Sequence, residues 1–373
     1  MPALPPPEVL ARRIRELAAG LGFTDLGFAR RVPPADRAHL ARWLALGRHG
    51  EMAYMARHGE KRVDPEALVP GTLSVISVRL DYLHAAARPM EELLADPERA
   101  AISRYALGRD YHKVLRGRLR ALARAIAAEY GPFGYRVFVD SAPVLEKALA
   151  REAGLGWIGK HTNLIHPRGG SWCFLGELYT DLPLAPDRPP VPDRCGSCTR
   201  CLAACPTGAI VAPYQLDARL CISYLTIEHR GPIPEPLRPR IGNRVFGCDD
   251  CQVVCPWNRF ARRVTLPDFA PRPGLDGARL IELFAWSEEE FLRRSEGSPL
   301  RRAGYEGFLR NLAVALGNGP PSAEAMAALA ARRSHPSPLV REHVAWALAE
   351  LSRKARGAAP RAGDPPAPAP RTG

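Results

Sequence analysis

Eight of the nine cysteines lie in one stretch of the chain, between positions 195 and 255. They are Cys195, Cys198, Cys201, Cys205, Cys221, Cys248, Cys251 and Cys255. Thiols clustered in this way in a cytosolic protein indicate metal or redox chemistry rather than a disulfide framework. The ninth cysteine, Cys173, stands alone, and we interpret it as a buried bystander because a free cysteine behaves as a small hydrophobic residue.

The spacing of these cysteines predicts two [4Fe–4S] clusters. The run from Cys195 to Cys205, followed by proline, has the C-x2-C-x2-C-x3-C-P pattern of bacterial ferredoxins, in which the cysteine before the proline ligates the other cluster. The run over 248–255 lacks a first cysteine because Val245 stands there, and Cys221 can fill the gap. Zinc or disulfides are the alternatives, but this pattern occurring almost twice is not a zinc spacing. The crossing rule assigns cluster one to Cys195, Cys198, Cys201 and Cys255, and cluster two to Cys205, Cys221, Cys248 and Cys251.

Three polar segments precede the cysteines and could hold the chemistry that such clusters supply with electrons. Residues 103–112 (SRYALGRDYH) are polar and aromatic, Asp140 follows a predicted strand, and residues 154–161 form a glycine-rich loop that ends in His161. Each has a plainer interpretation. Asp140 could cap a helix over 143–153, the glycines could serve only turns, and His161 could be structural.

Helix and strand patterns alternate through about residue 183 and predict an N-terminal α/β or α+β domain. Helices are expected over 5–22, 36–57 and 111–130, and strands over 22–28, 73–78 and 135–139. A proline-rich bridge over 181–193 separates this domain from the cysteines. Further helices are expected over 279–293, 305–317 and 338–353, and the helix pair within 323–353 is similar to one HEAT-type repeat.

We therefore predict an α+β protein in four parts. They are an N-terminal α/β cofactor-binding domain (1–188), a ferredoxin-like domain with two [4Fe–4S] clusters (189–265), a helical HEAT-like region (266–354) and a disordered tail (355–373). The sequence contains no run of about 18 apolar residues and no signal peptide, so we expect a cytoplasmic protein without a membrane span.

The charge balance is strongly basic, with 52 Lys and Arg against 39 Asp and Glu, a net charge of +13. An excess of this size suggests a polyanionic partner such as nucleic acid, because clustered cations release counterions from phosphate backbones. The alternative is compositional drift, since the chain is rich in Ala, Pro, Arg and Gly.

Five segments taken together resemble the epoxyqueuosine reductase family. They are RYALGRDYH (104–112), VDSAP (139–143), GWIGKH (156–161), CISYLT (221–226) and GNRVFGCDDC (242–251). The resemblance runs from about residue 10 to about residue 351. It implies reduction of the epoxide of epoxyqueuosine to queuosine at the wobble position of tRNA anticodons, with cobalamin and two [4Fe–4S] clusters as cofactors.

The resemblance also implies a set of site residues. Asp140 becomes the proton donor, which would require burial to raise its pKa from an unperturbed value of about 3.9. The residues implied to contact cobalamin are Arg62, Ser103, Tyr105, Asp140, Lys160, His161, Leu164, Ser171, Ser223 and Tyr224. The D-x-H-x-x-G motif of histidine-ligated cobalamin enzymes is absent, which implies a cofactor without a protein histidine below cobalt.

The implied partners are tRNA and a cytosolic electron donor such as flavodoxin or ferredoxin, and we expect a monomer. Candidate contacts to the anticodon stem are Arg238, Arg240, Arg244, Arg259, Arg262, Arg263, Arg332, Arg333 and Arg341. Two other functions stay open at this point. One is a cobalamin-dependent reductive dehalogenase of a small substrate, and the other is a two-cluster electron-transfer subunit.

Overall fold

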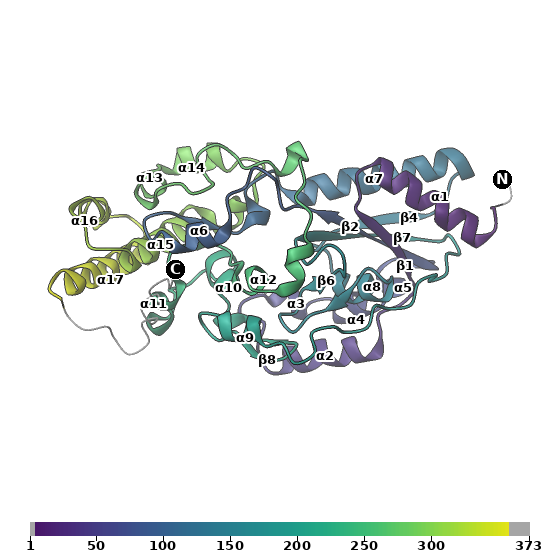
Figure 1. The fold of residues 1–373 in the computed structure, drawn as a ribbon, viewed down its shortest axis with the longest axis horizontal. Coiled ribbons are helices and arrows are strands. Elements are labelled where there is room, and N and C mark those ends of the chain that lie inside the picture. The colour runs from purple at the N-terminus through teal and green to yellow at the C-terminus, as the bar shows by residue number, and fades with distance from the viewer. Residues whose placement is uncertain (1–3, 358–373) are drawn as a thin grey trace.

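The structure, a computed structural model of the chain, describes residues 4–357. The first three residues and residues 358–373, which hold most of the tail predicted to be disordered, lie outside the described residues. Figure 1 shows an elongated molecule with a β-sheet near one end, long helices at the other end, and the elements around the cysteines between them. No helix among the described residues is long and apolar enough to span a membrane.

The sheet has four strands in the order β1-β2-β7-β4, and every neighbouring pair is antiparallel. The strands are β1 (Asp25–Ala29), β2 (Ser74–Asp81), β4 (Tyr135–Phe138) and β7 (Cys173–Thr180). Sheets of α/β proteins are mostly parallel, whereas this one is not. The α+β class is therefore confirmed for the chain, and the α/β description of its N-terminal domain is wrong.

Helices cover both faces of this sheet (Figure 1). The helices α1 (Pro7–Gly20) and α7 (Tyr111–Tyr130) pack on one face, and α8 (Glu146–Glu152) packs on the other. On the first face, apolar residues of α1 and α7 such as Ile14 and Leu119 interlock with strand residues such as Ile76. The sheet is thus buried between helices, and the loop that joins β4 to α8 carries Asp140 to its edge.

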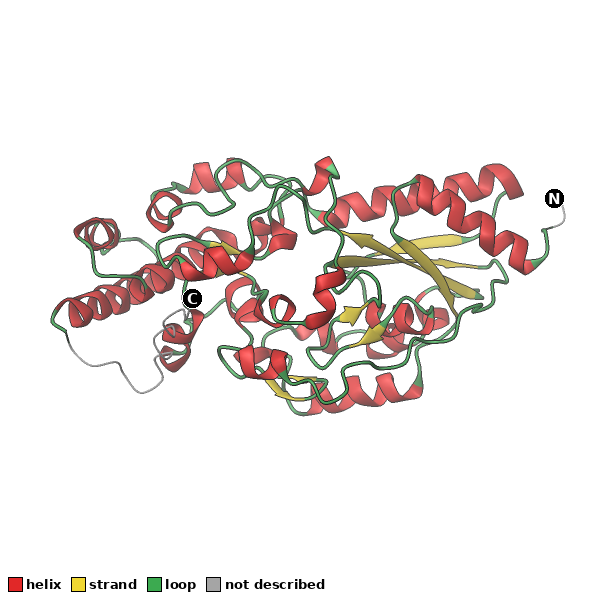
Figure 2. Cartoon of the chain, viewed as in Figure 1, coloured by secondary structure: helices red, strands yellow, loops and turns green. Residues whose placement is uncertain are grey.

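The remaining elements are mostly short and connected by long loops (Figure 2). Helices in this part are α2 (Pro34–Ala45), α3 (Ala53–Ala56), α4 (Gly59–Val63), α5 (Pro65–Leu68), α6 (Met90–Ala95), α9 (Arg200–Ala204), α10 (Ile222–Ile227), α11 (Arg238–Ile241) and α12 (Asp250–Val253). The short strands pair as β3 (Ala101–Ile102) with β10 (Arg244–Phe246), β5 (Trp157–Ile158) with β6 (Leu164–Ile165), and β8 (Ile210–Ala212) with β9 (Gln215–Leu216). The helix predicted over 36–57 is wrong as one element, because Gly47 and Gly50 have φ of 63° and 57° and end it.

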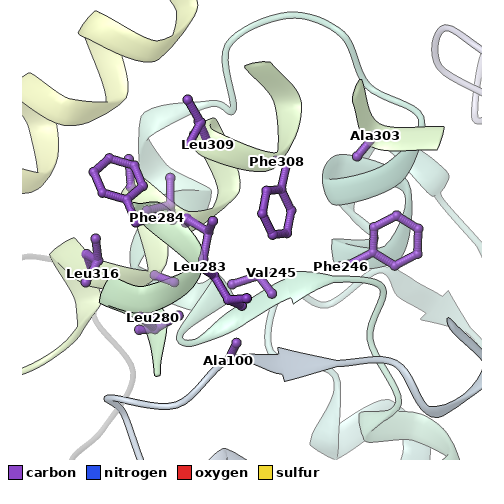
Figure 3. Packing of buried hydrophobic residues seen from close by; sticks show 14 of the residues in the cluster. Ala100, Val245, Phe246, Leu280, Leu283, Phe284, Ala303, Phe308, Leu309 and Leu316 are labelled. Carbon is purple, nitrogen blue, oxygen red and sulfur yellow. The ribbon is translucent and has the colours of Figure 1, made fainter. Parts of the chain in front are cut away.

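The C-terminal helices form the second large core, part of which Figure 3 shows. They are α13 (Leu280–Phe284), α14 (Glu288–Arg294), α15 (Gly304–Asn318), α16 (Ala323–Ala330) and α17 (Pro338–Ala355). The helix predicted over 279–293 is two helices, because Ser287 starts α14 with a capping box. The helix pair predicted within 323–353 is present as α16 and α17.

This second core does not follow the predicted domain limits. It includes Ile102 from the N-terminal part and Phe246 from the cysteine region, together with Phe308 and Leu309 of α15. Arg310 of α15 donates hydrogen bonds to three backbone carbonyls between positions 225 and 231. A shared hydrophobic core and the buried guanidinium group of Arg310 therefore hold the helical region and the cysteine region together.

Candidate active site

The eight cysteines predicted as ligands fall into two groups of neighbours in the structure. The thiol of Cys201 lies near those of Cys195 and Cys255, and Cys255 also lies near Cys198. The other four are neighbours in the same way. They are Cys205, Cys221, Cys248 and Cys251. These are the two sets that the crossing rule predicts for cluster one and cluster two.

Residues outside the cysteine region donate hydrogen bonds to two cysteine loops, one around 195–198 and one around 248–251. The Lys160 ammonium donates to the backbone carbonyls of Gly196 and Cys198, at 2.6 and 3.0 Å. The Ser103 hydroxyl and the Arg104 backbone N–H both donate to the carboxylate of Asp249, which lies between two cysteines of the second group. Two residues implied to touch cobalamin, Ser103 and Lys160, thus bind the cysteine loops.

A large cavity of about 1040 Å³ lies between the sheet domain and the cysteine region. The N-terminal part contributes Asp140 and His112, and the cysteine region contributes Cys221 and Ser223. Aromatic and apolar side chains supply much of the rest of the lining. They are Trp43, Met52, Tyr54, Tyr105, Tyr111, Tyr224, Ile227 and Phe246. A predicted cluster ligand and the predicted proton donor therefore face the same space.

Asp140 makes two close polar contacts in this cavity. Its Oδ2 accepts a hydrogen bond from the Tyr111 hydroxyl, and its Oδ1 lies 2.7 Å from His112 Nε2. The other ring nitrogen of His112, Nδ1, lies 2.6 Å from Oδ1 of Asp110. Asp140 does not cap α8, whose N-cap is Leu145. Tyr111 and His112 are functional candidates that sequence reasoning left unassigned, although both lie inside a quoted motif.

His112 is a cation at neutral pH in this arrangement. Burial of the ring opposes its charge, but the hydrogen bonds to Asp110 and Asp140 outweigh burial and raise the pKa of His112 to about 9. Asp140, with 38% of its side chain exposed, is therefore contacted by a protonated histidine and a tyrosine. The burial predicted for a proton donor is absent at this residue.

A smaller cavity of about 150 Å³ lies on the other side of Asp140 and Tyr111, which line both cavities. Burial, followed by the charge of Asp140, raises the pKa of Glu146 in this cavity to about 8. Cys173 also lines it, and burial raises the pKa of this thiol to about 11, so it stays protonated. The predicted bystander thus lies beside the site, and it is half-buried rather than fully buried.

Several buried polar atoms near the small cavity have no hydrogen-bond partner among the described residues. They are Oε2 of Glu146, both carboxylate oxygens of Glu177 and Nε2 of His161. Burial, followed by the charge of Lys147, lowers the pKa of His161 to about 4, so this ring is neutral. Unpaired buried polar groups are costly, and a bound ligand that carries amides and hydroxyls would satisfy them.

Of the ten residues implied to contact cobalamin, seven line one of the two cavities. Five line the large one: Arg62, Tyr105, Asp140, Ser223 and Tyr224. Leu164 and Ser171 line the small one. The other three, Ser103, Lys160 and His161, line neither cavity.

The arginines proposed from the sequence as RNA contacts divide into two kinds. Arg238 is buried, pairs with Glu342 and lies 5.8 Å from the ring of Trp346, while Arg332 donates to the carbonyls of Phe284 and Trp286. These contacts stabilise the helical region, so the structure does not favour these two arginines as RNA contacts. Arg244, which is half-buried, pairs with Asp250. The exposed ones are Arg240, Arg259, Arg262, Arg263, Arg333 and Arg341.

A basic groove of about 460 Å³ next to Asp140 was not anticipated from the sequence. Arg116, Arg120 and Arg124, one helical turn apart on α7, line it together with Arg136 of β4, and no acidic residue does. The groove also includes Ser141, which the large cavity shares. The i, i+4, i+8 spacing was the available signal for this groove.

Comparisons with known proteins agree with this geometry. A family model described as epoxyqueuosine reductase QueG, DUF1730, matches residues 62–141, and a 4Fe-4S double cluster binding domain matches residues 194–258. The epoxyqueuosine reductase of Pseudomonas aeruginosa is 61% identical over 344 residues, which cover 92% of this chain and 95% of that protein. The chain belongs to the epoxyqueuosine reductase family. The family member from Escherichia coli is 52% identical over 91% of this chain and 89% of its own length.

Solved structures of this family have the same fold. An epoxyqueuosine reductase crystallised with an epoxyqueuosine-modified tRNA-Tyr stem loop matches with a TM-score of 0.84 and 32% identity, over 93% of this chain and 91% of that one. The Bacillus subtilis enzyme matches with a TM-score of 0.83 and 32% identity, over the same shares of the two chains. In that structure an aspartate-bearing catalytic loop is swung out of the active site.

The residues present fit the cofactors of the epoxyqueuosine reductase family. Eight thiols in two groups of four suit two [4Fe–4S] clusters. The large cavity slightly exceeds the usual range of volumes for small-molecule sites, and the unpartnered polar atoms near the small cavity suit a large ligand with many amides. Cobalamin is such a ligand.

Proposed function

We propose that this chain reduces the epoxide of epoxyqueuosine, at the wobble position of tRNA anticodons, to queuosine. One observation carries the proposal beyond family membership. The large cavity is lined both by Asp140, beside a protonated histidine, and by Cys221, a predicted ligand of cluster two. A proton source and an electron source therefore face one space, as the reduction of an epoxide requires.

The chain's own residues would hold cobalamin in the two cavities. Arg62, Tyr105, Ser223 and Tyr224 would contact it in the large cavity, and Leu164 and Ser171 in the small one. When bound, cobalamin supplies a reducible cobalt that can attack the epoxide or pass electrons to it. Aromatic side chains around the large cavity would help to shield the reacting atoms from water.

Asp140 is proposed to deliver the proton. Reductive opening of an epoxide takes two electrons, and the oxygen that leaves carbon must be protonated. Asp140 lies at the boundary of the two cavities, and His112 donates to it through Nε2. Since His112 is protonated below about pH 9, its Nε2 proton can pass through Asp140 to the oxygen that leaves carbon. The proton therefore comes from His112, and Asp140 relays it.

The basic groove on α7 is proposed to bind the phosphates of the anticodon stem-loop. It runs into the large cavity at Ser141, so an RNA backbone along Arg116, Arg120 and Arg124 would lead a splayed-out wobble base toward Asp140. Phosphate contacts of this kind position an RNA and make its affinity depend on salt.

The electron donor, the location and the oligomeric state are also proposals. We propose a flavodoxin or a ferredoxin as the donor, a cytoplasmic location and a monomer. Reductive dehalogenation and simple electron transfer, the alternatives from the sequence, would both give no conversion of epoxyqueuosine.

The experiment uses purified chain with reconstituted clusters, added cobalamin, an epoxyqueuosine-containing stem-loop RNA and a chemical reductant, and measures nucleosides by liquid chromatography. Wild type should produce queuosine, and absence of product would refute the function. Asp140→Ala should keep the iron content and the cobalamin spectrum but lose turnover by at least about 100-fold. A variant that reduces epoxyqueuosine at the normal rate would refute the role of Asp140.

A further inference from the structure

A second basic groove, of about 960 Å³, lies on the cysteine region. Four exposed arginines line it: Arg88, Arg200, Arg259 and Arg263, of which Arg88 lies 3.8 Å from the Glu92 carboxylate. A fifth, Arg104, is buried and paired with Asp276, and the one acidic residue in the lining is Glu91. The groove therefore carries a net positive charge, which nothing in the mechanism above uses.

The groove reaches a predicted ligand of cluster one. Cys255 lies in its lining, and Arg200 precedes Cys201, another predicted ligand of the same cluster. The large cavity with Asp140 instead contains Cys221, a predicted ligand of cluster two, and the two lining sets have no residue in common. The two clusters thus face two different openings, and a molecule in this groove would leave the substrate cavity free.

Apolar side chains also line the groove. They are Met90, Trp172, Val253, Val254 and Pro256, of which Met90 and Trp172 are buried. Apolar surface beside exposed charges suits a transient protein–protein contact, in which charge complementarity sets the association rate and a small apolar patch gives modest affinity. A nucleic acid would gain less from the apolar side chains, and the groove on α7 is the one proposed to lead RNA to Asp140.

We propose that this groove docks an acidic, one-electron carrier protein, with the carrier's redox group beside Cys255. The inference rests on the proposed function, because it assumes that cluster one is bound by Cys195, Cys198, Cys201 and Cys255. Each docking oxidises the carrier by one electron and reduces the cluster by one, without proton transfer or a covalent bond. Two dockings deliver the two electrons that one epoxide consumes.

The test uses the reconstituted, cluster-loaded chain and a reduced acidic flavodoxin as the probe, mixed anaerobically in a stopped-flow instrument. The variant is R88E/R200E, and the matched control is R12E/R30E, which reverses two exposed arginines of the sheet domain. At about 0.05 M salt, the control should match wild type, and R88E/R200E should bind flavodoxin and accept its electrons about tenfold more weakly and more slowly. At about 0.5 M salt, the difference should shrink to about twofold, because ions screen the exposed charges.

Three further measurements complete the test: iron content, reduction by dithionite and affinity for stem-loop RNA. Iron content and the rate of reduction by dithionite should be the same in R88E/R200E as in wild type. If the double variant loses iron, the single variant R200E is used in its place. Unchanged flavodoxin binding and electron transfer in the variant would overturn the docking site. A fall in stem-loop RNA affinity instead would also overturn it, since the groove would then be an RNA site. Failure of the proposed function is distinct, because wild type driven by dithionite would then leave epoxyqueuosine unreduced.

Discussion

Replacing His112 with glutamine removes the cation that lies between Asp110 and Asp140, at 2.6 and 2.7 Å from their Oδ1 atoms. Although burial opposes its charge, the two carboxylates raise the pKa of His112 from 6.5 to about 9. Each pKa unit corresponds to about 1.4 kcal/mol, which would give about 3 kcal/mol for a fully shielded group. Because 24% of the His112 side chain and 38% of the Asp140 side chain are exposed, solvent screening leaves about 1–2 kcal/mol.

The sign of the pH dependence follows from the direction of this shift. Below pH 6.5 the histidine is protonated in both the folded and the unfolded chain, so the stabilisation is fully present. As the pH rises toward 9, the folded chain retains a proton that the unfolded chain has lost, and the stabilisation declines. The difference in free energy of unfolding between wild type and His112→Gln is therefore largest near pH 6 and smallest above pH 9.

Thermal unfolding followed by circular dichroism, at one scan rate and at pH 6.0, 7.5 and 9.5, measures this difference. We expect Tm of His112→Gln to lie about 1–3 °C below wild type at pH 6.0 and the gap to close at pH 9.5. His39→Gln, which changes an exposed histidine, should show no such gap. A gap that stays constant, or that widens with pH, would refute the assignment of the cation. Turnover of His112→Gln should fall at least about tenfold, with stem-loop affinity unchanged.

Three more predictions concern the clusters, the RNA and the shared core. Cys221→Ala should lose about half of the bound iron, whereas Cys173→Ala should keep all of it, as an iron assay would show. R120E/R124E should weaken stem-loop binding about tenfold or more at low salt and reduce the slope of log affinity against log salt by about 1.4, and an unchanged slope would remove the groove as an RNA site. Arg310→Leu leaves three carbonyls without their donor and should lower the free energy of unfolding by about 2–4 kcal/mol in a denaturant titration, and a loss below about 1 kcal/mol would contradict that role.

Elements with strong local patterns were predictable from the sequence. The helix over 111–130 agrees with α7, and the strand over 135–139 agrees with β4 to within one residue. The strand β7 (Cys173–Thr180) was not predicted, although it pairs with both β2 and β4. Its residues are buried on both faces, so no alternation marks it, and a short apolar run of this kind is distinguished from other buried segments only by its tertiary partners.

Many residues of the site could be predicted from the sequence, whereas most of the contacts between them could not. Spacing alone separated the cysteines into the two groups that lie together in the fold. The pairing of Asp140 with His112 was not predictable, because the two residues belong to separate motifs that only folding brings to 2.7 Å. Lys160 was implied to grip a cofactor, but the sequence could not show that the carbonyls of the cysteine loop lie within its reach.

The arginines show why composition fails to locate a nucleic-acid surface. Arg238 and Arg332 are basic residues near the expected site, yet their guanidinium groups donate hydrogen bonds to backbone carbonyls and lie over aromatic rings of the helical region. Arg120 and Arg124 lie on the helix predicted over 111–130 and were not proposed as RNA contacts, but they line a groove next to Asp140. The burial of each side chain and the surface that it faces, rather than its charge, separate arginines engaged inside the protein from arginines that line the groove.

The nucleoside content of tRNA from a strain that lacks this gene tests the central claim most directly. Liquid chromatography should show epoxyqueuosine in place of queuosine, and a plasmid with the wild-type gene should restore queuosine while one with Asp140→Ala should not. Queuosine at its normal level in the deletion strain would contradict the account.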